Sequence, residues 1–389
     1  MAAAGGAGMA RIFITGGTGY LGSYVCEELL RRWPDLRLAM LIRGSDHETA
    51  VRKLWKSWQL HMGAEQFERY MRRVQVVLGD LHAPDLGIDP ALRRELITDT
   101  DSVLHIAASL NRKSAKACLN TNLRGTLSVI KLARQMADSG GLRRFSHVST
   151  AAVAGFRSNE VVQEDTSIEW SRSDYDPYAR TKKFCEHMAH ELLPDVPHTI
   201  FRPSTVLGDS RFPDTTQWDM VRAFCFLADL PVVPWSGTVR QDVVNADFVG
   251  RAIATVHMKD KPEHGIYHLS AGAGSLTSEQ IVRAMVAGGR RSPRFSPALT
   301  RSFDRTMRGL NRLPRGNSAQ SIGALMKVFL PYVTNNAVFD NRRICEELGE
   351  TPVSFDAYCA RLYAYGKEHD FTYDYVDWPE QLDHLLEAP

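Results

Sequence analysis

Short apolar runs alternate with longer stretches of helical periodicity along the first two-thirds of this chain. The apolar runs span 11–15, 36–42, 74–78, 102–106, 144–149 and 198–202, and a loop follows each, which predicts β-strands. Between the first two runs, Leu21, Val25 and Leu29 recur four residues apart and would share one face of a helix. A second helix is predicted over 122–138. Strand and helix alternating in this way predict an α/β fold with a parallel sheet covered on both faces.

The pattern changes near residue 270. A strand over 265–270 and a helix beginning near Thr277 close the alternating region, which gives a predicted nucleotide-binding domain over 10–270. Residues 271–389 are expected to form a smaller, mostly helical C-terminal lobe that binds substrate. The Ala/Gly-rich residues 1–9 are interpreted as a disordered leader.

The overall composition narrows the kinds of protein that this chain could be. The chain has 389 residues, 44% hydrophobic and 24% charged, with a net charge of +2, which argues against a design for nucleic acid. No apolar run reaches the roughly 18 residues of a membrane span. Six scattered cysteines without a CxxC pair indicate reduced thiols, no metal site and a cytoplasmic location.

A glycine-rich turn follows the first predicted strand. Gly16, Gly19 and Gly22 stand three residues apart between that strand and a helix. Gly16 would permit the tight turn, Gly19 would let the backbone approach a pyrophosphate, and Gly22 would let helix and strand pack closely. The turn therefore predicts a Rossmann-type, doubly wound sheet that binds a dinucleotide at a helix N-terminus.

The residue that ends the second strand bears on the choice of dinucleotide. An acid at this place suits the ribose 2′-hydroxyl of NAD, whereas this chain has Arg43, which suits a 2′-phosphate. Arg52 or Lys53 could add charge. The expected cofactor is NADPH, and a solvated loop arginine is the alternative interpretation of Arg43. Asp80, after the third strand, is placed to accept from the adenine amino group.

A tyrosine and a lysine four residues apart provide candidate chemistry. Tyr178 and Lys182 would share a helix face just after Asp176 and Pro177. A free phenol has a pKa near ~10, and a nearby ammonium lowers that pKa. Thr150 follows the fifth strand and could hydrogen-bond a substrate carbonyl; Ser149 is the alternative for this role.

An arginine-rich segment lies in the C-terminal part. Positions 290–315 hold eight arginines and one acid, Asp304. Such a segment suits phosphate groups or an acidic protein surface. A solvated basic face is an equally good interpretation, and contact with anionic lipid headgroups is a third.

Several motifs together resemble the extended short-chain dehydrogenase/reductases, and more narrowly their thioester reductase, fatty acyl-CoA reductase and carboxylic acid reductase branch. The resemblance covers roughly 10–270, with Ser204 standing where the family usually has Gly. The motifs are TGGTGYLG (15–22), LIRG (41–44), GDL (79–81), HIAASLN (105–111), NTNLRGT (120–126), HVSTAAVAG (147–155), YARTKKFCE (178–186), FRPSTVLGDS (201–210) and QDVVNADFVG (241–250).

Position by position, the resemblance implies Thr150, Tyr178 and Lys182 as catalytic residues. His105 is given no catalytic role. The residues it implies for NADP(H) binding are Gly16, Thr18, Gly19, Tyr20, Leu21, Gly22, Arg43, Asp80, Leu81, Ala107, Tyr178, Lys182, Pro203, Ser204 and Val206.

The expected activity is NADPH-dependent reduction of an acyl thioester, from coenzyme A or a carrier protein, to an aldehyde or on to an alcohol. The alternatives are a 3β-hydroxysteroid dehydrogenase or a sugar-nucleotide epimerase of the same extended family. A catalytically silent NADP-binding regulatory protein is a third class, which the intact Thr, Tyr and Lys set disfavours. Ala151 and Ala152 stand where sugar-nucleotide dehydratases place acids, which argues against dehydration.

Overall fold

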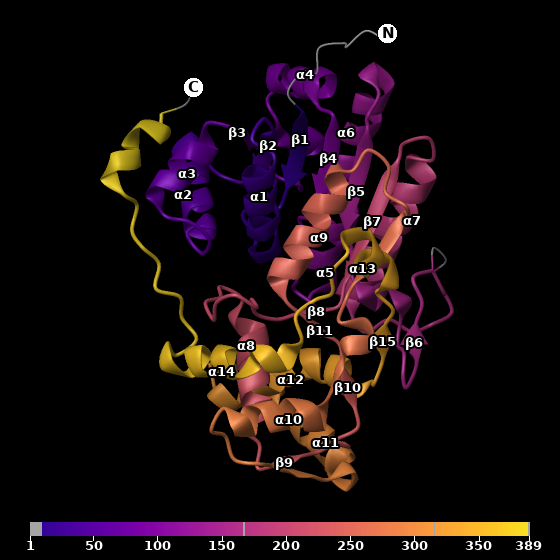
Figure 1. Ribbon diagram of the computed structural model, residues 1–389. Coiled ribbons are helices and arrows are strands. Elements are labelled where there is room, and N and C mark those ends of the chain that lie inside the picture. Colours follow the sequence, from indigo (N-terminus) through magenta and orange to yellow (C-terminus); the bar gives the residue numbers. More distant parts are fainter. Residues whose placement is uncertain (1–9, 166–167, 315, 388–389) are drawn as a thin grey trace.

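A parallel sheet of seven strands forms the core of the computed structural model, which describes residues 10–165, 168–314 and 316–387 (Figure 1). The predicted leader over 1–9 lies outside the described residues. The strand order is β12-β7-β5-β4-β1-β2-β3, and every pairing in the sheet is parallel. The strands are β1 (Arg11–Thr15), β2 (Arg37–Ile42), β3 (Val74–Leu78), β4 (Ser102–His105), β5 (Arg144–Val148), β7 (His198–Pro203) and β12 (Ile266–Leu269).

This topology confirms the predicted Rossmann-type fold, and the predicted strand ends differ from the observed ends by no more than one residue. The chain runs outward from β1 through β2 to β3 and then returns to β4, on the other side of β1. The connections after β1 and β4 therefore diverge at the carboxyl edge of the sheet, which opens the crevice where nucleotides bind in such folds.

Helices cover both faces of the sheet because their apolar stripes form two separate cores. Helices α1 (Tyr20–Arg32), α2 (His47–Trp58) and α9 (Ala246–Met258) contribute to one core. Helices α4 (Pro90–Asp99), α6 (Gly125–Gly140) and α7 (Pro177–Leu192) contribute to the other. The predicted helix over 122–138 corresponds to α6, which follows α5 (Ala115–Cys118) and a π-helical turn, η2 (Leu119–Arg124).

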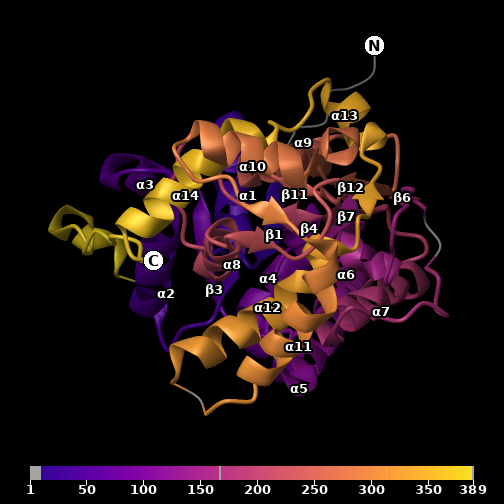
Figure 2. The same ribbon diagram turned by 90° about the horizontal axis from the view of Figure 1, so that it is seen from below.

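A mostly helical lobe lies below the carboxyl edge of the sheet, as predicted for the C-terminal part. It contains α10 (Ser278–Ala287), α11 (Thr300–Leu310), α12 (Ser318–Thr334) and α14 (Cys359–Glu368). It also contains α8 (Trp218–Ala228), which packs between α14 and α12 (Figure 2). Val221 and Cys225 of α8 share a core with Ile281 and Leu362, so a segment from the middle of the chain helps to build this lobe.

Within the described residues, four pairs of two-residue strands connect distant segments. In each pair the bonded strands come from separate parts of the chain, and their shortness leaves no periodicity for a sequence to show. They are β8 (Thr205–Val206) with β11 (Val243–Val244), β9 (Val232–Val233) with β14 (Arg294–Phe295), β10 (Arg240–Gln241) with β13 (Leu276–Thr277), and β6 (Val161–Val162) with β15 (Val338–Phe339).

The C-terminal segment returns from α14 to the Rossmann domain. It appears in Figure 1 as the yellow chain that rises from α14 toward α2 and α3 (Ala64–Met71). Trp378 packs edge-on against Trp55 and Phe67, with ring centroids 6.4 and 6.2 Å apart. The indole nitrogen of Trp55 donates to the Val376 carbonyl at 3.2 Å. The segment thus ties the lobe back to the first half of the sheet.

Six free cysteines agree with the reduced thiols expected from sequence; five are buried, and Cys345 is partly buried. Within the ranges described above, no helix has both the length and the apolar character of a membrane-spanning segment.

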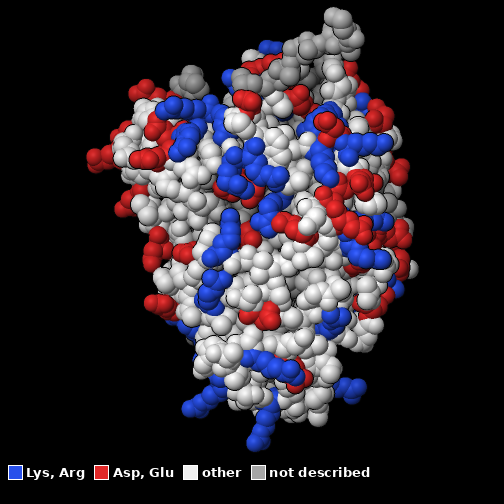
Figure 3. Space-filling model, viewed as in Figure 1, with Lys and Arg blue, Asp and Glu red and all other residues white. Residues whose placement is uncertain are grey.

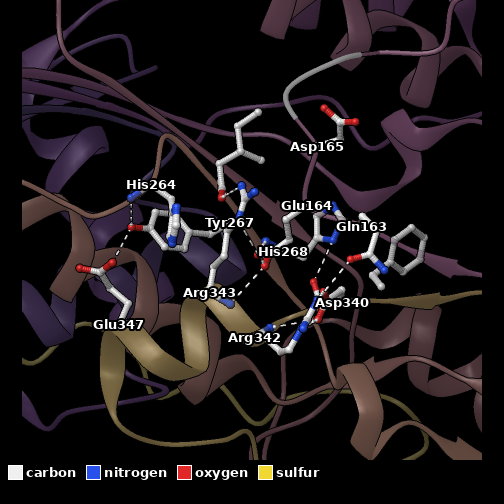
Figure 4. A network of polar contacts seen from close by, with 12 residues as sticks. Gln163, Glu164, Asp165, His264, Tyr267, His268, Asp340, Arg342, Arg343 and Glu347 are labelled. Atoms are coloured by element: carbon white, nitrogen blue, oxygen red, sulfur yellow. Dashed lines mark hydrogen bonds and ion pairs between the residues drawn. The ribbon is translucent and has the colours of Figure 1, made fainter.

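A polar network docks α13 (Arg342–Leu348) and β15 onto the edge strand β12 (Figure 4). The buried Glu164 carboxylate accepts hydrogen bonds from the backbone nitrogens of His268 at 2.7 Å and Arg343 at 3.1 Å. The hydroxyl of Tyr267 donates to Glu347 of α13 at 2.7 Å. Burial raises the pKa of Glu164 to about 7, against the opposing effect of its backbone hydrogen bonds.

Replacing Glu164 should therefore change how stability depends on pH. A carboxyl with a raised pKa binds a proton more readily in the native than in the unfolded state, so its stabilising effect is lost as pH rises toward 7. Between pH 5 and pH 8, wild type should lose on the order of 1–3 kcal/mol of unfolding free energy relative to Glu164→Gln. Urea unfolding at both pH values measures this. Glu65→Gln, at an exposed position on α3, is the matched control. The raised pKa of Glu164 would be contradicted if the unfolding free energies of wild type and Glu164→Gln differed by the same amount at both pH values.

Candidate functional site

Backbone packs directly against backbone in the glycine turn between β1 and α1. Gly16 has φ +82°, and a Cβ there would lie 2.5 Å from the Ala107 nitrogen. A Cβ on Gly22 would lie 2.0 Å from the Gly16 carbonyl oxygen. Gly19 is the N-cap of α1, and no side chain caps this end of the helix. The free N–H groups of the first turn thus offer a binding place for the phosphates of a dinucleotide.

Positive side chains gather where β2 ends. Arg43 is exposed and lines the same cavity as the glycine turn. Lys53 and Lys56 of α2 line it as well, and the Lys53 ammonium donates to the Arg43 carbonyl. Arg52, the other cation considered from sequence, lies 2.8 Å from Glu48 in an ion pair. Three cations from β2 and α2 therefore line the cavity.

Helix α7 carries the Tyr178 and Lys182 pair. The Asp176 carboxylate caps the helix by accepting from the Ala179 nitrogen at 2.8 Å, and Pro177 occupies the first helical position. The buried Lys182 ammonium donates to the Val148 carbonyl at 2.7 Å. Burial lowers the pKa of Lys182 to about 8. This bond joins α7 to the end of β5, where Thr150 begins the next turn.

The largely buried Tyr178 phenol lies beside Thr150 at the wall of the cavity. Burial raises the pKa of Tyr178, while the positive charge of Arg112 and a hydrogen bond with the Thr150 side chain lower it. Thr150, rather than Ser149, contacts the phenol. The Ser149 hydroxyl is buried and has no hydrogen-bond partner within the described part of the chain. The two hydroxyls of Thr150 and Tyr178 could together hold a carbonyl oxygen.

His105 is a packed strand residue, as the sequence indicated. Its imidazole bridges Thr15 at 2.6 Å and Thr126 at 2.9 Å. Burial lowers the pKa of His105 to about 3, so the ring is neutral and fully engaged.

The turn after β7 is held by a buried carboxylate. Asp242 accepts from the Ser204 hydroxyl at 2.8 Å and from the backbone nitrogens of Ala271 at 2.8 Å and Phe339 at 2.9 Å. Burial raises the pKa of Asp242 to about 6. The motif around 241–250 thus acts as a scaffold that shapes the 203–206 turn.

One cavity of about 1380 Å³ brings together every site residue predicted from sequence. Their roles in binding and catalysis stay predictions. The residues are Gly16, Thr18, Gly19, Tyr20, Leu21, Gly22, Arg43, Asp80, Leu81, Ala107, Thr150, Tyr178, Lys182, Pro203, Ser204 and Val206.

The apolar wall of this cavity was missed by sequence reasoning. It is formed by Phe224 and Leu227 of α8 with Leu325, Val328 and Phe329 of α12. Their helical spacing is typical of ordinary core residues, so only the fold shows that they face a cavity. Arg112 was also missed, although it directly follows the HIAASLN motif.

The fold and this cavity define a dinucleotide-binding protein of the extended short-chain dehydrogenase/reductase class. Residues 14–253 match the NAD-binding family described as male sterility protein, and this match spans more than half of the chain. The protein therefore belongs to that family.

Two curated proteins are similar to this chain in sequence. The nonribosomal peptide synthetase asaC of Aspergillus flavus is 29% identical over 65% of this chain and 25% of its own length. The putative fatty acyl-CoA reductase CG8303 of Drosophila melanogaster is 28% identical over 52% of this chain and 42% of its own length. The chain thus spans less than half the length of either relative.

The terminal R domain of the myxalamid PKS-NRPS biosynthetic pathway shares the fold. The TM-score is 0.80 at 24% sequence identity, with 95% of this chain and 93% of that one covered.

Substituting Gly22 should weaken dinucleotide binding. In Gly22→Ala, the added Cβ would meet the Gly16 carbonyl at 2.0 Å, so the turn must open. Isothermal titration calorimetry should show NADPH affinity falling by roughly tenfold or more. Gly140→Ala is the matched control, because a Cβ there meets no atom within 4 Å. Equal NADPH affinity in Gly22→Ala and wild type would refute the phosphate site.

Proposed function

We propose that this protein reduces an acyl thioester to an aldehyde with NADPH. The observation that carries the proposal is the set of residues that line one cavity. The glycine turn, the paired hydroxyls of Thr150 and Tyr178, the buried Lys182 and an apolar wall all line it. A reductase of this kind needs a dinucleotide site, a carbonyl-binding pair and room for an acyl group.

The residues present fit NADPH. The glycine turn would hold the pyrophosphate, and Arg43, Lys53 and Lys56 would pair with the 2′-phosphate. Asp80 would accept from the adenine amino group. When bound, NADPH supplies the hydride for the reduction.

The protein's own groups would act on the substrate oxygen. Thr150 and Tyr178 donate hydrogen bonds to the thioester carbonyl oxygen, which gains negative charge as its carbon is reduced. Tyr178 then transfers its proton to that oxygen, and a hemithioacetal results. Its C–S bond breaks, the thiol leaves, and the aldehyde remains. Reduction of the aldehyde carbonyl in the same pocket, with the hydride of a second NADPH and a proton from Tyr178, would give an alcohol. No cysteine nucleophile is required, in line with six thiols that are all buried or partly buried.

The apolar wall suits the acyl group. Phe224, Leu227, Leu325, Val328 and Phe329 present hydrocarbon surface within the cavity that holds Tyr178. Burying an acyl chain there stabilises the complex by roughly 0.8 kcal/mol per CH₂ group. Both relatives support an acyl substrate, because one is described as a peptide synthetase and the other as a putative fatty acyl-CoA reductase.

Delivery by coenzyme A or by a carrier protein is supported by a basic face on the C-terminal lobe. Arg301, Arg305, Arg308 and Arg312 are exposed on or just after α11, about one or two helical turns apart. Figure 3 shows positive side chains projecting from the lower end of the molecule, where Figure 1 places α10, α11 and β9. Phosphate groups and acidic proteins are the partners that such a face attracts.

Removing the proton donor should stop turnover without affecting NADPH binding. Tyr178→Phe keeps the buried ring but lacks the hydroxyl, so the reduced substrate oxygen receives no proton. NADPH oxidation followed by absorbance should fall by roughly a hundredfold or more. The dissociation constant of NADPH should match that of wild type. Unchanged turnover would exclude this role for Tyr178.

The substrate is best identified with a panel. Acyl-CoA esters, acyl groups on a carrier protein, aldehydes and sterols are each added to wild type and NADPH. Turnover of thioesters supports the proposal, and turnover of sterols alone would overturn it.

Cofactor preference should depend on Arg43. Arg43→Ala removes a charge-assisted contact to the 2′-phosphate, which NADH lacks. The ratio of NADH to NADPH dissociation constants should fall on the order of tenfold. Arg52→Ala is the matched control, since Arg52 is paired with Glu48. A ratio in Arg43→Ala equal to that of wild type would contradict the proposed 2′-phosphate contact.

A further inference from the structure

Arg112 lies between two tyrosines, one of which is the proposed proton donor. Its guanidinium carbon is 4.8 Å from the ring centroid of Tyr178 and 4.8 Å from that of Tyr332. Arg112 comes from the loop between β4 and α5, and Tyr332 from α12 in the C-terminal lobe. Both side chains line the cavity that holds Tyr178. The cation thus lies over the face of the reacting phenol.

A shared carboxylate holds this arrangement. Asp176 accepts from the Arg112 guanidinium at 3.4 Å and from the Tyr332 hydroxyl at 3.0 Å through the same oxygen. Its other oxygen caps α7, the helix that carries Tyr178. Tyr332 also stacks on Tyr175, with ring centroids 4.7 Å apart and the planes 20° from parallel. The guanidinium is therefore fixed relative to Tyr178 by groups from both the Rossmann domain and the lobe.

The charged and titratable groups around Tyr178 come from four elements. Arg112 approaches from the loop after β4, Cys118 from α5, Tyr332 from α12, and Asp176 from the start of α7. Lys182, also on α7, directs its ammonium to the Val148 carbonyl. Arg112 is thus the cation in contact with the Tyr178 ring.

We infer that Arg112 is a positioning residue for proton transfer, which stabilises the Tyr178 phenolate that forms when the phenol protonates the substrate oxygen. The inference rests on the proposed function, because it assigns Tyr178 the role of proton donor. A cation over a neutral phenol gains a modest cation–π attraction. Once the proton has left, the same cation faces a full negative charge on a largely buried side chain, where the attraction is weakened less than in bulk water. The attraction between Arg112 and Tyr178 is therefore stronger after proton transfer than before it. An interaction lowers the barrier to a reaction only when it strengthens on the way to the transition state, and this one does.

The electrostatics of the site support this direction. Burial raises the pKa of Tyr178, and Arg112 is the strongest influence lowering it, whereas Asp176 raises it. Arg112 thus offsets part of the penalty of burying an acid that must ionise. Because Tyr332 and Asp176 hold the guanidinium, docking of α12 contributes to the acidity of Tyr178. This makes the C-terminal lobe part of the proton-transfer apparatus as well as a wall for substrate.

Three variants of the full-length protein test the inference. Arg112→Gln removes the charge, Arg112→Lys keeps it, and Arg180→Gln removes a similar charge from an outward-facing position of α7. Arg180 is 68% exposed and pairs with Asp174. In Arg112→Gln, kcat at pH 7 should fall roughly threefold to tenfold, with KM and the NADPH dissociation constant unchanged. Arg112→Lys should restore most of the lost kcat, and Arg180→Gln should match wild type.

The pH dependence of kcat tests the sign of the effect. Reduction needs the protonated phenol, so the alkaline decline of kcat should move to higher pH in Arg112→Gln, whereas Arg112→Lys should keep it near that of wild type. An effect on KM alone, a wild-type kcat in Arg112→Gln, or an alkaline decline that does not move to higher pH in Arg112→Gln would each overturn the inference.

Failure of the inference is distinguishable from failure of the proposed function. If wild type reduces thioesters and Arg112→Gln behaves like wild type, only the role of Arg112 is wrong. If wild type reduces no thioester, the proposed function fails. Titration of ¹³Cζ-labelled tyrosine by NMR, with Tyr178 assigned through Tyr178→Phe, then tests Arg112 without turnover. A Tyr178 pKa that is no higher in Arg112→Gln than in wild type overturns the inference by that route.

Discussion

A single buried hydrogen bond, from the Lys182 ammonium to the Val148 carbonyl at 2.7 Å, organises the candidate site. It attaches α7 to the carboxyl end of β5, so that Tyr178, one helical turn earlier, meets Thr150 at the start of the next turn. Burying an ammonium is unfavourable unless its hydrogen bonds are satisfied. The lowered pKa of Lys182, about 8, reflects that penalty. The Lys182 bond is formed despite this penalty. As a result, the Tyr178 phenol and the Thr150 hydroxyl are held together at the carboxyl edge of the sheet.

The parallel sheet explains why distant segments of the chain converge there. All seven strands run in one direction, so the loops after β1, β2, β3, β4, β5 and β7 reach the same edge. A buried carboxylate then shapes one of those loops. Asp242 links the turn after β7 to residues 271 and 339. This acid is part of the scaffold of the cavity, which gives a structural reason for a motif, 241–250, to which no chemistry is assigned. Glu164 has a separate role, since it holds α13 on the edge strand β12.

Much of this architecture could be predicted from sequence because it depends on local patterns. The strands are short apolar runs, and the glycine turn follows from steric demands that only glycine meets at Gly16 and Gly22. The Tyr178 and Lys182 pair follows from helical spacing. Each of these signals lies within a few residues of the chain, and all the predicted site residues line one cavity.

The remaining features depend on contacts between distant segments. Helix α8 has the apolar pattern of any packed helix, and nothing local shows that it belongs to the C-terminal lobe. Arg112 and Tyr332 are 220 positions apart in the numbering and meet only through tertiary packing. A fully exposed loop arginine and a partly buried one that contacts the reacting phenol look alike in sequence. The polar environment of Tyr178 therefore became apparent only from the structure.

The most direct measurement is the fate of a labelled hydride. The protein is incubated with an acyl thioester and NADPH that carries deuterium at C4 of the nicotinamide, and the product is analysed by mass spectrometry. The account predicts an aldehyde or alcohol with deuterium on the carbon that was the thioester carbonyl. Product without deuterium at that carbon from either C4-labelled form of NADPH would contradict it, as would intact thioester after prolonged incubation.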